Sequence, residues 1–107
     1  MCVYKIEEIA ERVRPIAERY GIPKVYLFGS YARGEATENS DIDLLIDAQN
    51  IRGLFALGGV YGDLEEALNK EIDLVTIEAL DERKDDPLTM KFVKEISSEE
   101  KLIYENK

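Results

Sequence analysis

The chain has 107 residues, 45% of them hydrophobic and 35% charged, which predicts a single folded domain over residues 1–107 rather than a disordered acidic tail. Its net charge of −9 argues against direct nucleic-acid binding, because DNA and RNA are held by basic surface. With no histidine and one cysteine, Cys2, it has no catalytic pair built on histidine, no internal disulfide and no cysteine-rich zinc cage. Any chemistry therefore falls to carboxylates, lysines, tyrosines, hydroxyls or bound metal ions.

No segment approaches the roughly 20 apolar residues that cross a bilayer, and the acidic N-terminus does not resemble a secretory signal. We therefore expect a cytoplasmic protein without membrane contact. Cys2, at the terminus, is expected to be inert.

The chain opens with a predicted amphipathic helix over residues 5–20. Its apolar residues recur at steps of three and four, at Ile6, Ile9, Val13, Ile16 and Tyr20. An interior proline costs about 3 kcal/mol, so the pattern predicts a kink or a break near Pro15. Gly21 is a plausible helix stop.

Two strands with a loop between them follow. Residues 24–28 (KVYLF) form a β-branched and aromatic run typical of a buried strand. A short helix is predicted to start within residues 31–33, and the polar residues 34–40 predict a loop. Residues 41–47 (DIDLLID) predict the second strand.

The second half of the chain predicts two helices and two strands. Residues 53–69 have apolar side chains at helical spacing, but Gly58, Gly59 and Gly62 each cost about 1 kcal/mol against alanine. That helix is expected to start late or to be split around Gly58-Gly59. The remaining predictions are a strand at 71–77, a charged connection at 81–86, a helix at 87–96 and a short strand at 101–104. Such alternation predicts an α/β (α+β) fold, a small sheet with helices packed on it.

Acidic residues on the predicted strands carry the chemistry. Side chains alternate faces along a strand, so Asp41 and Asp43 point the same way while Ile42, Leu44 and Ile46 point into the core. Asp73 is a single acid in a similar setting on the later strand. Two close carboxylates repel, so either one is protonated or a cation neutralises them. An all-oxygen ligand set favours magnesium, manganese or calcium over zinc.

Gly29 and Ser30 supply the complementary half of a phosphate site. A glycine at a strand end lets a ligand approach the backbone closely, and the Ser30 hydroxyl adds a hydrogen bond. A helix that begins near Ser30 would also offer free amide groups to phosphate.

Gly29-Ser30, followed after ten residues by Asp41-x-Asp43, resembles the signature of the polymerase-β-like nucleotidyltransferase superfamily. The fuller strings at 27–34 (LFGSYARG) and 39–44 (NSDIDL) resemble more narrowly the minimal nucleotidyltransferase (MNT) family, and 71–76 (EIDLVT) resembles that family's strand with the third carboxylate. The likeness runs through residues 5–104.

The resemblance implies a small mixed β-sheet flanked by helices. It makes Asp41 and Asp43 metal ligands, Asp73 the third acid at the metals, and Gly29 and Ser30 the triphosphate site. The implied reaction uses ATP and two Mg²⁺ ions, with Mn²⁺ as the alternative, and transfers a nucleoside monophosphate to an acceptor hydroxyl. Many members are antitoxins that add AMP to a tyrosine of a HEPN ribonuclease toxin.

Several alternatives stay open. Arg33 either meets a phosphate or pairs with a nearby acid, with equal weight, and Ser40 either assists the nucleotide or, preferably, caps the turn before the strand. Asp47 is expected to be solvated. The function itself has two competitors: a catalytically silent antitoxin that acts by occlusion, and a transferase with a small-molecule, aminoglycoside-type acceptor. Homo- or hetero-oligomerisation is also left open.

Overall fold

The computed structural model describes residues 3–106, so the prediction for Cys2 lies outside the described part of the chain. The elements, in chain order, are α1 (Ile6–Tyr20), β1 (Lys24–Phe28), α2 (Gly29–Arg33), β2 (Ile42–Ile46), α3 (Gly53–Leu68), β3 (Ile72–Thr76), α4 (Ile77–Glu82), α5 (Pro87–Glu99) and β4 (Lys101–Glu105).

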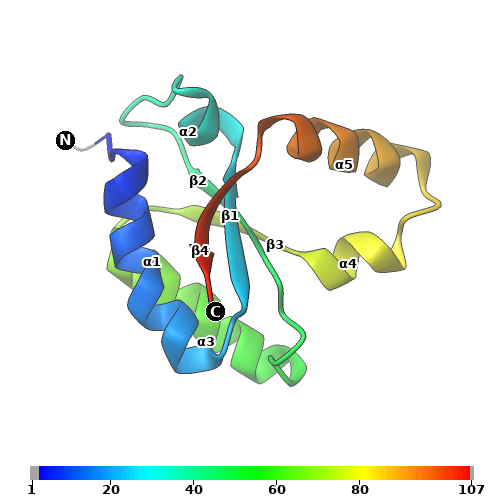
Figure 1. The fold of residues 1–107 in the computed structure, drawn as a ribbon, viewed down its shortest axis with the longest axis horizontal. Helices are drawn as coiled ribbons and strands as arrows, with labels where there is room; N and C mark the ends of the chain where they lie inside the picture. Colours follow the sequence, from blue (N-terminus) through cyan, green and yellow to red (C-terminus); the bar gives the residue numbers. More distant parts are fainter. Residues whose placement is uncertain (1–2, 107) are drawn as a thin grey trace.

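The strands form one mixed four-stranded sheet in the order β3-β2-β1-β4 (Figure 1). Strand β1 runs antiparallel to both β2 and β4, whereas β2 and β3 are parallel. A parallel pair needs a crossover connection, and α3 provides it between β2 and β3. The predicted fold, a small mixed sheet flanked by helices, is confirmed.

The main hydrophobic core lies between one face of the sheet and helices α1 and α3. Val25 and Leu27 of β1 and alternate residues of β2 pack there against Ile9 and Val13 of α1. A smaller cluster of Phe28, Leu45 and Ile96 lies on the opposite face, under α5. That second face is covered only in part, and it is the face to which Asp43 belongs by strand alternation.

Three predictions about the elements need correction. Of the kink or break predicted near Pro15, the break is wrong: helix α1 runs on to Tyr20, because burial of Ile9, Val13 and Ile16 outweighs one missing backbone hydrogen bond. Helix α3 is likewise continuous from Gly53, held by buried residues in its second half. Helix α4 includes the first two residues, 81 and 82, of the predicted charged connection at 81–86. The Thr76 hydroxyl caps this helix by accepting from the Ala79 N–H at 3.1 Å.

One glycine of α3, Gly59, lies against helix α1. A Cβ on Gly59 would stand 3.0 Å from the Tyr20 hydroxyl, so this glycine allows α3 to approach α1. Gly58 and Gly62 face open space. Among residues 3–106, no helix has the length and apolar character required to span a membrane.

Candidate active site

The sheet places the acidic residues side by side on its partly covered face. Asp41 directly precedes β2, Asp43 is the second residue of that strand, and Asp73 is the second residue of β3. Asp43 and Asp73 are register partners in the parallel β2–β3 pair, so their side chains leave the sheet on the same side. Asp41 is near enough for its charge to raise the pKa of the Asp43 carboxyl. The three acids thus lie at the end of the sheet where β2 and β3 begin.

The electrostatics of Asp43 confirm that negative charge gathers here. Burial raises the pKa of the Asp43 carboxyl to about 6, with further upward contributions from the charges of Asp73, Asp41 and, more weakly, Glu99. The nearby Arg33 guanidinium lowers this pKa but does not compensate. The negative charge of the cluster is therefore only partly compensated, a condition that a bound cation relieves.

Gly29 lies against this cluster at the end of β1. It has φ +75°, a conformation that side-chain-bearing residues rarely adopt, and a Cβ at this position would overlap the Asp43 carboxylate. Asp43 and Phe28 are register partners, which explains why the next residue, Gly29, meets the Asp43 side chain. Ser30 follows in α2 and is half-buried.

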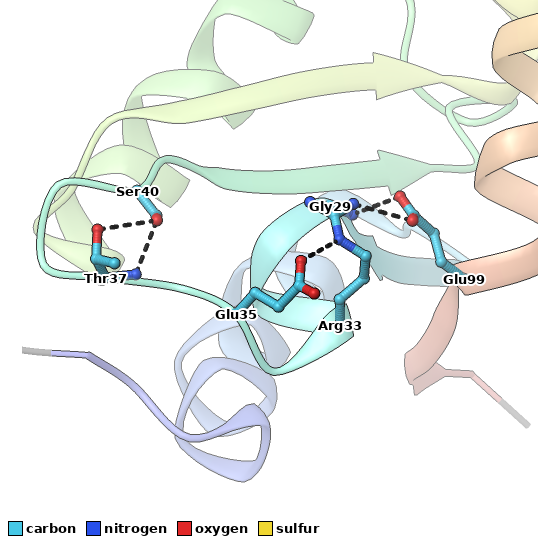
Figure 2. Close-up of polar contacts among 6 residues, drawn as sticks. All are labelled: Gly29, Arg33, Glu35, Thr37, Ser40 and Glu99. Atoms are coloured by element: carbon cyan, nitrogen blue, oxygen red, sulfur yellow. Dashed lines mark hydrogen bonds and ion pairs between the residues drawn. The ribbon is translucent and has the colours of Figure 1, made fainter.

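Arg33 pairs with acids on both sides of it (Figure 2). Its Nε donates to Glu35 Oε1 at 2.9 Å, and its Nη1 donates to Glu99 Oε2 at 3.0 Å. These hydrogen bonds, the Glu35 bond first, raise the pKa of Arg33. Of the two roles predicted for Arg33, pairing with a nearby acid is the one present in the structure.

Ser40 is used in the loop before β2. Its hydroxyl accepts from the Thr37 N–H at 2.9 Å, as the turn-capping interpretation requires. Figure 2 shows Ser40 beside Thr37 and well apart from Gly29, Arg33 and Glu99. The structure therefore does not bring Ser40 together with the other predicted phosphate-binding residues.

Glu99 is a site residue that the sequence patterns do not reveal. Apolar periodicity predicts a helix that ends at Ile96, but α5 continues to Glu99, whose carboxylate accepts from the Gly29 N–H at 3.1 Å. Apolar periodicity cannot predict this contact, because the contact depends on how the chain returns to β1 after α5. The pairing of β4 with β1 is the feature that brings the end of α5 to Gly29.

The donor set fits magnesium or manganese. Within residues 3–106, no three acidic or cysteine side chains come close enough to enclose a metal ion by themselves. Magnesium does not need such a cage, because it typically takes one or two carboxylates and completes its coordination with substrate phosphates and water. Asp41 and Asp43 supply oxygen donors of this kind, beside an uncompensated negative charge.

Comparison with known proteins agrees with this geometry. The family model of the nucleotidyltransferase domain matches residues 6–104. The protein adenylyltransferase MntA of Thermococcus cleftensis is 37% identical over 79 residues, which cover 70% of this chain and 80% of that protein.

Two solved structures share the fold. A toxin–antitoxin crystal structure with AMP-PNP superposes with a TM-score of 0.69 at 21% identity, covering 92% of this chain and 74% of the other. A complex of tri-AMPylated HEPN toxin with MNT antitoxin from Shewanella oneidensis has a TM-score of 0.64 at 17% identity, covering 94% and 73%. From the fold, the placement of the acids and the family match, this chain belongs to the nucleotidyltransferase domain family, in its minimal nucleotidyltransferase branch, and is an enzyme of that class.

Proposed function

We propose that this chain transfers AMP from ATP to a hydroxyl group of a protein, with the help of divalent cations, and that the acceptor is a tyrosine of a HEPN ribonuclease toxin. The observation that carries the proposal is the register pairing of Asp43 with Asp73, with Asp41 near enough for its charge to raise the pKa of Asp43. The name of the Thermococcus relative supports protein adenylylation, and the Shewanella complex supports a HEPN partner.

The residues divide the work between cation and phosphate. Asp41 and Asp43 would hold the cations, two Mg²⁺ ions by resemblance, and the raised pKa of Asp43 means that its charged form gains from a cation nearby. Gly29 and Ser30 would bind phosphate oxygens through the backbone amide and the hydroxyl. Magnesium, when bound, neutralises phosphate charge and favours ionisation of a hydroxyl beside it.

The transfer itself needs no covalent enzyme intermediate. The acceptor oxygen would form a bond to the α-phosphorus of ATP while the bond to the pyrophosphate oxygen breaks. Asp73 is exposed, so an acceptor on a second protein can reach it. We assign Asp73 to the acceptor side, where its carboxylate orients the hydroxyl and is placed to accept its proton.

The test is transfer of labelled AMP to a candidate HEPN partner. The purified chain, Mg²⁺, ATP labelled at the α-phosphate and the partner should give a labelled partner protein. Asp41→Asn and Asp43→Asn should each lower the rate by about 100-fold or more, because loss of a group that only supports a metal ligand already costs roughly 10–100-fold. Asp73→Asn should lower it by about 100-fold or more, because a general base contributes roughly that factor. Asp47→Asn serves as the matched control, since Asp47 lies beyond the far end of β2 and should retain activity.

Other outcomes identify the competing functions. Equal labelling by all the Asp→Asn variants would contradict the proposal. Neutralisation of the toxin without label, retained in Asp43→Asn, would indicate an antitoxin that acts by occlusion. Label found only on an added aminoglycoside would indicate a small-molecule acceptor. Within the proposed function, replacing each tyrosine of the partner by phenylalanine identifies the tyrosine whose hydroxyl accepts the AMP.

A further inference from the structure

The end of α5 is held opposite the phosphate-binding turn by strand pairing. In the antiparallel β1–β4 pair, Leu27 is the register partner of Lys101. Gly29 comes two residues after Leu27 and Glu99 two residues before Lys101, so the two residues face each other. The Glu99 side chain is only 22% exposed, so the packing of α5 confines its carboxylate to this position.

Both carboxylate oxygens of Glu99 are engaged there. Oε1 accepts from the Gly29 N–H at 3.1 Å and Oε2 accepts from Arg33 Nη1 at 3.0 Å (Figure 2). Figure 2 shows the carboxylate of Glu99 directed from α5 at the turn that carries Gly29, where the Arg33 guanidinium also contacts it. The Glu99 carboxylate, an anion, thus already accepts hydrogen bonds from the Gly29 amide and the Arg33 guanidinium at the candidate phosphate site.

A phosphate oxygen and this carboxylate cannot both hold the Gly29 amide. An N–H group has one hydrogen to donate, and two anions at this distance repel. Glu99 also adds to the negative charge around Asp43, so its presence makes the site less favourable for a triphosphate. When Glu99 moves away, the Gly29 amide and Arg33 lose their acceptor. Phosphate oxygens, with equal or greater charge, compensate by accepting from the same two donors.

We propose that Glu99 closes the nucleotide site of the free enzyme and that the triphosphate must displace it, taking over the Gly29 amide and the Arg33 guanidinium. This inference rests on the proposed function. The apparent affinity for nucleotide is then the intrinsic affinity multiplied by the fraction of molecules in which Glu99 has moved away. Glu99 sets nucleotide affinity, and its departure frees the last turn of α5 when nucleotide binds.

The experiment measures binding of a non-hydrolysable ATP analogue with Mg²⁺ by calorimetry. Glu99→Gln removes the competing charge at constant size and should lower the Kd by about tenfold, as a shift of the open fraction by that factor requires. Glu95→Gln is the matched control: it makes the same change one turn earlier in α5, on an exposed side chain, and should change the Kd less than about twofold.

Equal or weaker binding of the analogue by Glu99→Gln overturns the inference, provided that a melting curve shows the variant to be folded. If Glu99 only supported the turn, its replacement would weaken nucleotide binding instead of strengthening it. If neither the unaltered chain nor the variant binds the analogue with Mg²⁺, the proposed function fails as well. The two failures are therefore distinguishable.

A measurement on the unaltered protein avoids dependence on the variant. In a titration followed by NMR, the Gly29 amide resonance and the Glu99 carboxylate carbon resonance should shift together and saturate at the same analogue concentration. A Glu99 carbon resonance that stays unchanged at saturation would overturn the inference.

Discussion

At the scale of single residues, the site depends on one contact between a glycine and an acid. Gly29 has no Cβ, and Asp43 occupies the space where that atom would stand. The glycine therefore serves two purposes at once: it accepts a positive φ, and it leaves room for a carboxylate beside a backbone amide. A residue with a side chain rarely adopts this φ and would leave no room for the Asp43 carboxylate.

Gly29→Ala should lower the free energy of unfolding by more than about 2 kcal/mol, since the left-handed conformation alone costs about 1–2 kcal/mol and the collision with Asp43 adds to it. AMP transfer should be lost with it. Gly34→Ala is the matched control, because Gly34 has a similar φ of +76° but nothing lies within 4 Å of the place where its Cβ would stand. Urea unfolding of both variants gives the comparison, and equal losses would show that the contact with Asp43 is unimportant.

Asp43→Asn should stabilise the metal-free protein at neutral pH while it abolishes transfer. The folded-state pKa of Asp43 is about 6, above the ordinary value of 3.8, so the folded state binds the proton more tightly than the unfolded state does. The carboxyl then costs nothing below about pH 4, and its cost grows as the pH rises to about 6 and stays constant above it. Because Asp43 is only half-buried, we expect screening to reduce this cost to about 1 kcal/mol.

The measurement is the difference in unfolding free energy between Asp43→Asn and the unaltered chain, from pH 3 to pH 8 without divalent cations. The difference should be near zero at pH 3 and should favour the variant by about 1 kcal/mol at pH 8. A difference that does not depend on pH would contradict the assigned repulsion.

At the scale of elements, α3 makes the site possible because it returns the chain for a parallel β2–β3 pair. Its glycines weaken it as an isolated helix, but Val60, Leu64 and Leu68 are buried against the core. Tertiary packing outweighs propensity in this helix, as is usual for helices in folded proteins. The parallel register that results is what aligns Asp73 with Asp43.

Gly62→Ala should raise the free energy of unfolding by about 1 kcal/mol, since alanine is the better helix former and nothing lies within 4 Å of the added Cβ. Gly59→Ala should gain less or lose stability, because its Cβ would stand 3.0 Å from the Tyr20 hydroxyl, which donates to Asp63 Oδ2 at 2.7 Å. Chemical denaturation of the two variants decides the point, and an equal gain in both would show that α1 and α3 are not closely packed at Gly59.

At the scale of the whole molecule, the strand order gathers groups that are far apart in the sequence. The Gly29–Glu99 contact joins residues 70 positions apart, and the Asp43–Asp73 pair joins two strands connected by α3. Negative charge collects at this one end of the sheet, so a cation and a nucleotide that bind there should stabilise the entire fold.

Saturating Mg²⁺ with a non-hydrolysable ATP analogue should therefore raise the melting temperature. A ligand at 100 times its Kd stabilises the folded state by about 2.7 kcal/mol, which corresponds to roughly 10 °C for a domain of this size. The Asp43→Asn/Asp73→Asn double variant should lose most of this rise in melting temperature. Thermal unfolding of both proteins with Mg²⁺ and the analogue, and again with a chelator added, measures the difference. A shift of equal size in the double variant would place the ligand elsewhere.

Local patterns are sufficient to predict the strands, the mixed α/β character and the acids that lie near one another at the candidate site. Alternation along residues 41–47 places Asp41 and Asp43 on one face, and this depends only on backbone geometry. The glycine-serine turn at the end of β1 is equally local. These features follow from neighbouring residues, so sequence patterns determine them.

Contacts between distant segments decided the rest. Helix α1 passes Pro15 and α3 passes its glycines because burial against the sheet stabilises them more than the local penalties cost. The sequence alone does not decide whether Arg33 meets a phosphate or pairs with an acid. Its acidic partner Glu99 reaches Arg33 only because α5 and β4 return to β1. Periodicity describes which face of an element is buried, but not which residue of a remote element it will meet, and that choice is made by the packing of the whole sheet.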